Sequence, residues 1–590
     1  MSFLFSCFFP GEVPLYFALE VNPNIMIYNL RKVIAEELKD LKVNISHLDL
    51  ILFKTDIPLE PLETRLQRSL QFIHTHRTNV LEMSDAVQQA FPTNPFGDKR
   101  LHIIVATEDI LEGIDVVGDP YKMKLAKGLE KKFSFPSSGP PPSQVVASAE
   151  YIEAFFNATT RPVSMDGVPV AMFSPPLAKL QQHVENLNAL KPTNGEILLA
   201  TRYWACATKW YKDESDREKD IRQHVDSLVG QPGQWQTRLD WAGNNGIKPD
   251  AAWWHLLFVL IIFELKNILG IAGDAILQSA VDYEKIVSSA KFKKFSASSN
   301  FPAVLLGISG SRIQLAIAVC TGPIYVSNIY TLDLASGFHA SAKIMELARV
   351  FHAIALCRTD LQAYYDKIFV SHTRYDVTSV FPNPTFVNAD APELIYTHCI
   401  ARTGEPTSTI PNLVNAATAI YFAKLASSGE EVVVKFTAQY SKAAHQLLAD
   451  AGFAPKLHFC DMIVGGLYIV VMERIKGKSI WQLLQEKEAI PSLVGKRVEA
   501  AISCLHNANL VFGDLRDANV LYSRSDDPAV EGKVFLIDFD WTDKDGEGRY
   551  PPTLNISNAL AENVTPSGLM RKEDDLWHLD RLKKLCAQDP

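Results

Sequence analysis

Three ionisable side chains bracket a long apolar run in the middle of the chain. Asp250 precedes the run from Ala251 to Phe263, and Glu264 and Lys266 follow it. In a β-strand, Glu264 and Lys266 would lie on the same face, because side chains alternate with a period of two. Two carboxylates, a substrate phosphate and several waters suffice to hold Mg²⁺ or Mn²⁺, and a nearby lysine can orient or activate an attacking water. The pattern therefore predicts a metal-dependent hydrolytic site.

This site requires the chain to reverse direction inside the apolar run. Fully extended, the fourteen positions from Asp250 to Glu264 would span about 45 Å. We expect the reversal near Trp254 and His255, although the run contains no Gly, Pro or Asn to favour a turn. A run this apolar is typical of a strand buried on both faces, and an ordinary buried strand with solvated charged ends remains the alternative.

A second set of residues, near the C-terminus, has an order and spacing that suit phosphoryl transfer. That reaction needs a carboxylate to accept the hydroxyl proton, an amide and a carboxylate to hold Mg²⁺, and a lysine for the phosphates of ATP. Asp514 and Asn519 stand five residues apart, and Asp538 follows a short apolar strand. A preceding strand, Glu431–Phe436, would carry Lys435. This set predicts an ATP site.

Length and composition describe an ordinary multidomain protein. The chain has 590 residues, several times the usual size of one domain, with 47% hydrophobic and 21% charged residues. A net charge of −9 argues against a globally basic nucleic-acid coat, so any DNA site must be local. The eight cysteines are scattered singly, which indicates thiols kept reduced inside a cell.

No membrane span and no cleavable signal peptide are expected. The longest uncharged apolar run has about 13 residues, fewer than the ~20 that a spanning helix needs. Prolines and a glycine interrupt the apolar segment at the beginning of the chain, and no basic residues precede it.

Proline, glycine and serine divide the chain. The stretch Phe133–Glu150 is dense in these residues and predicts a linker. A second boundary falls near Pro382–Pro384, where another α/β pattern begins. The resulting segments are a first domain, a linker, a middle domain and a last domain, at 1–108, 109–150, 151–380 and 381–590. We therefore predict a multidomain α+β and α/β protein.

Three runs in the first domain form a further pattern. They are Leu-Arg-Lys-Val-Ile at 30–34, Leu-Ile-Leu-Phe-Lys-Thr-Asp-Ile-Pro-Leu at 50–59, and Leu-His-Ile-Ile-Val at 101–105. Together they resemble the ubiquitin-like domain with which proteins of the Crinkler effector family begin. The resemblance implies a β-grasp fold over about the first 108 residues.

Pro249 and Asp250, followed by Glu264-Leu-Lys266, resemble the motif of the PD-(D/E)xK nuclease superfamily. In many Crinklers, a domain of this kind follows the ubiquitin-like one. The resemblance implies a restriction-endonuclease-like α/β fold for the middle domain. Asp250 and Glu264 would hold the metal, and Lys266 would assist the water.

Four other positions are weaker candidates at that site. Gln278 and Tyr283, on the helix after the motif, are polar residues of the kind that some of these nucleases use near the phosphate. Glu196 is a candidate for a further acid on the preceding helix. The segment Lys291–Phe295 interleaves cations with aromatic residues as a nucleic-acid groove would, or it is a solvated face.

The last domain resembles a protein kinase. Phe512-Gly-Asp514 stands where kinases have His-Arg-Asp, and Asp538-Phe-Asp540 stands for Asp-Phe-Gly. Tyr468–Glu473 resembles the hinge strand, so Glu473 would lie beside the nucleotide, and Asp575 matches a buried aspartate of a later helix. The pattern is similar to the fungal kinase-like proteins and the Crinkler kinases. It implies a bilobal fold in which Asp514 is catalytic and Lys435 contacts ATP, with Mg²⁺ on Asn519 and Asp538.

Three features depart from the kinase pattern. Only Gly404 remains of the glycine-rich loop, and the helix at 440–448 offers no glutamate to pair with Lys435. The chain ends soon after Asp575, which leaves a short C-terminal lobe. A nucleotide-binding domain without activity is therefore an open alternative.

These resemblances imply a Crinkler-type effector, secreted and delivered to a host cell and its nucleus. Its activities would be a metal-dependent DNA nuclease and a kinase-like phosphotransferase, with Mg²⁺ or Mn²⁺ and ATP as cofactors. Host DNA and host proteins would be its partners. Two alternatives remain: a non-catalytic host-interacting effector, and an active Ser/Thr kinase with an inactive nuclease-like domain.

Overall fold

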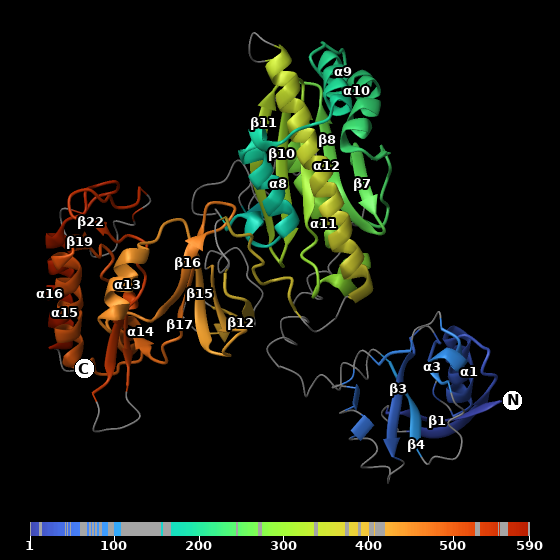
Figure 1. Cartoon of the computed structure of the whole chain (residues 1–590), viewed down its shortest axis with the longest axis horizontal. Coiled ribbons are helices and arrows are strands. Elements are labelled where there is room, and N and C mark those ends of the chain that lie inside the picture. Colours follow the sequence, from blue (N-terminus) through green and yellow to red (C-terminus); the bar gives the residue numbers. More distant parts are fainter. Residues whose placement is uncertain are drawn as a thin grey trace. The chain divides into compact units, whose positions relative to one another are not determined.

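The computed structural model divides the chain into two compact units, Met1–Lys124 and Leu125–Pro590 (Figure 1). The predicted linker at 109–150 lies outside the residues that the structure describes. The described residues are 2–10, 15–41, 43, 45–47, 49–58, 68–69, 72–73, 76, 79–81, 85–92, 100–107, 155–156, 167–242, 246–268, 274–335, 340–371, 377–387, 391–400, 406–407, 419–524, 531–552, 554 and 564–587.

The first unit contains a four-stranded sheet with the order β2-β1-β4-β3. The central pair, β1 and β4, is parallel, and the outer strands pair antiparallel to them. Helix α1 buries Ile27, Leu30, Ile34 and Leu38 in the core that it shares with the sheet, at the spacing of one helical face. The bounds are β1 Phe3–Phe9, β2 Leu15–Val21, α1 Ile27–Asp40, β3 Ile51–Pro58, α3 Val87–Ala90 and β4 Arg100–Ala106. This is the β-grasp arrangement that the sequence predicts.

The second unit begins with a seven-stranded sheet of order β5-β11-β10-β9-β8-β7-β6. Strands β8 and β9 are parallel, and helix α11 connects them and packs on both. Strand β8 is buried along its whole length, as expected for a strand covered on both faces. The strands are β5 Phe155–Phe156, β6 Gln234–Trp235, β7 Ala251–His255, β8 Phe258–Lys266, β9 Ala303–Ser309, β10 Arg312–Cys320 and β11 Ile324–Asp333.

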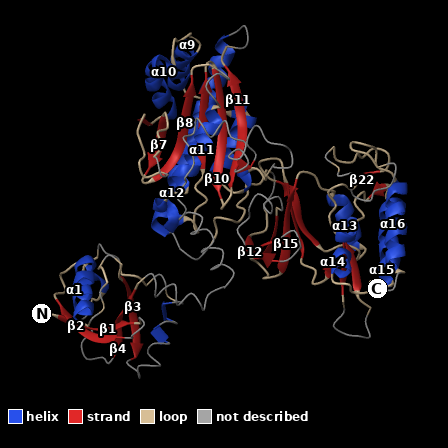
Figure 2. Ribbon diagram, turned by 180° about the vertical axis from the view of Figure 1, so that it is seen from behind, coloured by secondary structure: helices blue, strands red, loops and turns tan. Residues whose placement is uncertain are grey.

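Helices surround this sheet (Figure 2). The long helix α12 packs with α8, α9 and α10. Their bounds are η3 Val170–Met172, α8 Pro175–Glu185, η4 Leu187–Ala189, α9 Asn194–Ala207, α10 Glu214–Val229, α11 Ala275–Val287, η5 Ala290–Phe295 and α12 Ala340–Ser371. The middle of the chain is therefore an α/β domain of the predicted class.

Strands β7 and β8 form a tight antiparallel hairpin inside the apolar run. His255 pairs with Phe258, so Leu256 and Leu257 alone form the turn. Leu256 has φ of +53°, in the left-handed region that non-glycine residues seldom occupy. The reversal that the site requires is thus present, directly after the expected Trp254 and His255, and it depends on a strained leucine.

A six-stranded sheet, ordered β13-β12-β14-β15-β17-β16, begins the last part of the chain. Its neighbouring strands are all antiparallel, and helix α13 contacts β16. The elements are β12 Leu394–Ile400, β13 Pro406–Thr407, β14 Ile420–Leu425, β15 Glu431–Thr437, α13 Lys442–Asp450, β16 Leu457–Met462 and β17 Tyr468–Glu473.

A smaller, mainly helical lobe follows. Helices α15 and α16 pack together, and two short sheets, β18-β20-β21 and β19-β22, complete the lobe. The elements are β18 Lys478–Ser479, α14 Ile480–Gln485, α15 Leu493–Asn507, β19 Leu510–Val511, η6 Asp517–Asn519, β20 Val520–Ser523, β21 Lys533–Leu536, β22 Asp543–Lys544 and α16 Lys572–Cys586. A sheet lobe followed by a short helical lobe is the bilobal arrangement that the sequence predicts. Among the described helices, none carries an apolar stretch long enough to cross a bilayer.

Replacing Leu256 by glycine should stabilise the hairpin. Glycine adopts positive φ without strain, and the Leu256 side chain is 55% exposed, so little burial is lost. We expect Leu256→Gly to raise the free energy of unfolding by about 1 kcal/mol, measured by chemical denaturation. Leu257→Gly is the matched control, because its φ is not positive and glycine there should destabilise. Equal destabilisation by both variants would contradict the strained turn.

Candidate functional site

The hairpin brings the three predicted residues of the middle domain together. The backbone nitrogen of Asp250 donates to Glu264 Oε1 at 3.2 Å, and Asp250 Oδ2 accepts from the backbone nitrogen of Leu265 at 2.8 Å. Lys266 Nζ lies 3.9 Å from Glu264 Oε2. Glu264 and Lys266 are only 6% and 7% exposed. Asp250, Glu264 and Lys266 therefore converge where β7 begins and β8 ends.

Helix α10 supplies an acid that the sequence analysis did not identify. Glu214 Oε2 lies 3.8 Å from Lys266 Nζ, and burial raises the pKa of Glu214. One turn later, Glu218 Oε2 accepts a hydrogen bond of 2.9 Å from Gln236 Nε2, which also donates to Asp250 Oδ1 at 3.0 Å. The only sequence signal was a pair of acids four residues apart, which is also the usual spacing on a solvated helix face.

Glu196, the acid expected on a preceding helix, lies elsewhere. Its Oε2 accepts from the backbone nitrogen of Thr193 at 2.6 Å, which caps α9, and its Oε1 pairs with His352 Nδ1 at 2.6 Å. Both carboxylate oxygens are occupied by these contacts. Glu196 therefore has a structural role, and Glu214 is the helix acid beside Lys266.

The other three candidates contribute side chains to the core. Tyr283 Oη donates to the carbonyl of Phe301 at 2.7 Å and is fully buried, so it does not face a phosphate. Within Lys291–Phe295, both phenylalanines are buried, and Lys291 Nζ lies 3.9 Å from the ring centre of Trp241. The aromatic residues of this segment therefore cannot stack on bases. Gln278 is also buried, on the same helix as Tyr283.

Helix α11 adds a second buried acid, Asp282, against Glu264. Burial, together with Asp250 and Asp282, holds the pKa of Glu264 well above its ordinary value, although Lys266 opposes this. Burial also raises the pKa of Asp282 to about 7. Glu264 and Asp282 interact electrostatically, and burial disfavours the charged form of each. This cluster therefore holds more carboxylates than its cations neutralise.

The donor set fits a divalent cation that keeps most of its own water. In the part of the chain that the structure describes, no three His, Cys, Asp or Glu side chains are arranged to hold a metal ion on their own. Mg²⁺ needs only one or two carboxylates when substrate phosphates and waters complete its shell. Asp282 Oδ1 lacks a hydrogen-bond partner among the described residues, which agrees with a site short of positive charge.

A second concave site lies between the sheet and the helical lobe of the kinase-like part. It is a cavity of about 450 Å³, large enough for a nucleotide-sized ligand. Apolar side chains form most of the wall, and Lys435, Glu473 and Asp538 supply charge. The Glu473 backbone nitrogen donates to the carbonyl of Lys456 at 2.9 Å, which fixes the end of β17 beside the cavity. The predicted lysine, hinge residue and metal-binding acid thus line one cavity.

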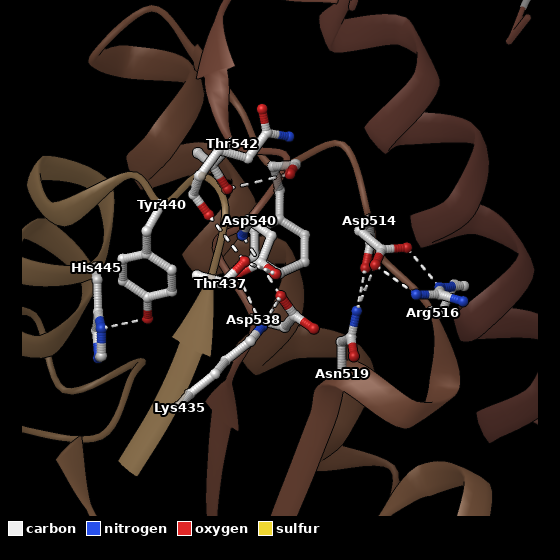
Figure 3. Close-up of polar contacts among 12 residues, drawn as sticks. Lys435, Thr437, Tyr440, His445, Asp514, Arg516, Asn519, Asp538, Asp540 and Thr542 are labelled. Atoms are coloured by element: carbon white, nitrogen blue, oxygen red, sulfur yellow. Dashed lines mark hydrogen bonds and ion pairs between the residues drawn. The ribbon is translucent and has the colours of Figure 1, made fainter. Parts of the chain in front are cut away.

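Lys435 lies between two carboxylates (Figure 3). Its Nζ lies 2.7 Å from Asp538 Oδ1 and 2.7 Å from Asp540 Oδ1. Burial opposes the charge of Lys435, but the two carboxylates raise its pKa overall. Burial likewise acts against the charge of Asp538, yet Lys435 lowers the pKa of this acid overall. Asp538 has φ of +71°, a strained conformation of the kind that clusters at functional sites.

The predicted proton acceptor and amide are also joined. Asn519 Nδ2 donates to Asp514 Oδ2 at 2.9 Å and to the Asp514 carbonyl at 2.9 Å. Arg516 Nη2 donates to Asp514 Oδ2 at 2.6 Å. Burial raises the pKa of Asp514, against the opposing effect of Arg516. Figure 3 shows Asn519 and Arg516 meeting the Asp514 carboxylate from two sides.

Asp575 holds the loop that carries Asp514. Its carboxylate is 1% exposed and accepts from the backbone nitrogens of Phe512 at 2.8 Å and Gly513 at 2.9 Å. A third bond of 3.0 Å joins it to His506 Nε2. Gly513 has φ of +79°, which favours glycine at this position. The buried aspartate of α16 therefore shapes the loop that carries Asp514.

Two features of the sheet lobe depart from the kinase pattern: the reduced glycine-rich loop, and the helix without a glutamate for Lys435. Gly404 lies outside the residues that the structure describes. Helix α13 presents His445 rather than an acid: the imidazole meets Tyr440 Oη at 2.7 Å and the carbonyl of Pro455 at 2.8 Å. Burial lowers the pKa of His445 to about 4, so it is neutral at physiological pH.

Comparison with known proteins identifies the first domain. Residues 4–106 match the family model of the Crinkler effector protein N-terminal domain, which confirms the predicted resemblance. No curated protein matches the chain. One matching solved structure is a kinase of Cydia pomonella granulovirus, with 16% identity and a TM-score of 0.23, over 29% of this chain and 65% of that kinase. This chain thus spans less than two thirds of that protein's length.

Removing the charge of Asp282 should stabilise the protein, and more so at high pH. A carboxyl group whose pKa is raised to about 7 disfavours folding increasingly as pH rises from its unfolded pKa, near 4, through 7. Without divalent metal, Asp282→Asn should therefore raise the free energy of unfolding by about 2 kcal/mol more at pH 8 than at pH 5. Thermal and urea denaturation at both pH values measure this.

Asp240→Asn is the control for this comparison, because the Asp240 side chain is 79% exposed. It should change stability little and equally at both pH values. An Asp282→Asn variant with the same small, pH-independent effect would contradict the buried acid pair.

Proposed function

We propose that this chain, whose residues 4–106 match the Crinkler N-terminal domain, is an effector delivered into host cells that acts as a metal-dependent DNA nuclease. A kinase-like domain that binds ATP would be coupled to it in the same chain. The observation that carries the nuclease proposal is the β7–β8 hairpin, which places Asp250 and Glu264 in hydrogen-bond contact with Lys266 beside them. Secretion, the host cell and the host nucleus are proposed from the Crinkler resemblance.

At the nuclease site, Asp250 and Glu264 would hold Mg²⁺ or Mn²⁺ together with substrate oxygens and water. The bound cation supplies Lewis acidity and lowers the pKa of its water. Gln236 and the backbone of Leu265 orient the Asp250 carboxylate. Lys266, held near Glu214 and Glu264, would orient the attacking water or neutralise charge that develops on the phosphate. The surplus of buried carboxylate supports cation binding here.

In the kinase-like domain, Lys435 would contact the nucleotide phosphates inside the cavity that it lines. Asp538 and the carbonyl oxygen of Asn519 would hold Mg²⁺, and Glu473 would lie at the hinge beside the nucleotide base. Bound ATP supplies the phosphoryl group. Asp514, whose carboxylate Asn519 and Arg516 orient, would accept the proton of the attacking hydroxyl. The cavity that joins Lys435 to Asp538 is the observation that favours this second activity.

Cleavage of supercoiled plasmid by the full chain tests the nuclease proposal. With Mg²⁺ or Mn²⁺ we expect nicking that Glu264→Ala and Lys266→Ala each reduce by about 100-fold or more, because each removes a group that acts on the reacting phosphate. Glu196→Gln is the matched control, since that carboxylate serves the cap of α9, and it should nick as the wild type does. Absence of nicking by folded wild-type protein under either metal would contradict the nuclease proposal and leave the kinase-like domain to carry the function.

Nucleotide binding tests the second site. We expect Mg²⁺ to strengthen ATP binding by the wild-type chain about tenfold or more, because the ion neutralises phosphate charge against Asp538. Asp538→Asn should remove this strengthening, and calorimetric titration with and without EDTA measures it. Autophosphorylation that disappears in Asp514→Ala would support transfer as well as binding. ATP binding that is indifferent to metal in the wild type would contradict the proposed site.

A further inference from the structure

The aspartate at the end of the Asp538-Phe-Asp540 segment stands where kinases have glycine, and it is tied to the phosphate-binding lysine. Asp540 Oδ1 lies 2.7 Å from Lys435 Nζ. Its other oxygen, Oδ2, accepts from Thr437 Oγ1 at 2.7 Å. Lys435 and Thr437 are two residues apart on β15, so they project on the same side of that strand. Asp540 is therefore attached to the lysine and to the strand that carries it (Figure 3).

Helix α13 offers Lys435 no such partner. The side chains that it buries are Ala444, His445 and Leu448, none of which is an acid. His445 is fully engaged, because both ring nitrogens have partners and its ring stacks on Phe539 at a centroid distance of 4.7 Å. The inward side of α13 thus packs against the segment 538–540 without contributing charge. The structure therefore agrees with the sequence that this helix supplies no acid for Lys435.

Lys435 nevertheless needs a partner that remains when a nucleotide binds. Of its two carboxylates, Asp538 is the proposed Mg²⁺ ligand, so the metal would compete with Lys435 for it. A lysine left with Asp538 alone would lose its anchor at the moment when the metal arrives. An ion pair with a second carboxylate, which Thr437 holds in place, avoids this, because the ammonium then keeps one acid partner.

We infer that Asp540 is the positioning residue for Lys435, in the role that an acid on the helix after this strand has in the kinases that the sequence resembles. This inference rests on the proposed ATP site and assigns its lysine anchor. The anchor belongs to β15 and the segment 538–540, since Thr437 fixes Asp540. The alignment of Lys435 is therefore set without any movement of α13, and ATP binding need not wait for that helix to shift.

The test compares Asp540→Asn with Asp540→Glu in the full chain. Three quantities are measured: the dissociation constant for ATP with Mg²⁺, the autophosphorylation rate at saturating ATP, and the rate at which an acetylating reagent modifies Lys435 without nucleotide, followed by mass spectrometry. In Asp540→Asn, acetylation of Lys435 should rise severalfold, because the ammonium loses one of its two carboxylates.

The same variant should separate binding from turnover. Its autophosphorylation rate should fall at least about tenfold, because Lys435 loses an ion-pair partner that aligns it. ATP should still bind with an affinity within about threefold of wild type. Asp540→Glu should recover part of the rate and the slow acetylation, which a merely structural role would not predict. Asp543→Asn, an exposed acid three residues later, should behave as wild type throughout.

The outcomes separate this inference from the function on which it rests. A wild-type chain that does not bind Mg²⁺–ATP overturns the proposed site, while the acetylation rates still decide whether Asp540 holds Lys435. Unchanged acetylation and unchanged turnover in Asp540→Asn overturn the inference even if ATP binds. A parallel loss of ATP affinity and folding stability, without recovery in Asp540→Glu, also overturns it, because Asp540 would then serve the fold alone.

Discussion

The cost of removing carboxylates from water governs both candidate sites. An isolated buried charge costs several kcal/mol, so buried acids are found paired, protonated or bound to cations. The middle domain places Glu264 and Asp282 near each other in its interior, where burial raises the pKa of both. The kinase-like domain places Asp538 and Asp540 around one ammonium. Neither arrangement stabilises a core as well as apolar packing would, and this is why both indicate sites.

The strands make these arrangements possible by where they end. Strand β8 is apolar until its last residues, so Glu264 and Lys266 come at the C-terminal end of the strand, where the neighbouring strand β7 starts. In the kinase-like domain, Lys435 lies near the end of β15, and Asp538 follows the end of β21. These two strand ends bring Lys435 to Asp538. Each site is associated with one residue whose backbone is strained by a positive φ. These residues are Leu256, in the hairpin turn, and Asp538. Backbone strain of this kind persists only where the surrounding packing determines it.

Much of the fold and of the two candidate sites could be predicted from the sequence, because the strongest sequence patterns are local. The apolar run before Glu264, the need for a reversal within it, and the loop around Asp514 are all visible in the order of residue types. Contacts between distant segments could not be predicted in this way. Glu214 has the same spacing as any solvated acid on a helix, and only the packing of α10 brings it to Lys266.

Asp540 could not be identified from sequence for a different reason. In the sequence it is a departure from a motif, since glycine is expected there, and the missing helix acid is a second departure. The structure joins the two, because the contacts of Asp540 compensate for the neutral α13. Conversely, the alternation of cations and aromatics in Lys291–Phe295 is a helical-turn pattern whose aromatic members face the core. A local pattern contains no information on which distant segments meet. Contacts between distant segments determine the roles of Glu214, Asp540 and the segment Lys291–Phe295.

The two sites should respond differently to the same divalent cation. In the middle domain the acids outnumber the cations, and burial raises the pKa of both Glu264 and Asp282, so an entering metal would compete with protons for these carboxyl groups. In the kinase-like domain, Lys435 already neutralises Asp538, so an entering metal would displace the Lys435 ammonium from that carboxylate. The ammonium can leave only if nucleotide phosphates or Asp540 neutralise its charge instead. Metal affinity at the first site should therefore depend on pH, and at the second on nucleotide. One chain can thus hold two sites for one ion with separate conditions for filling them.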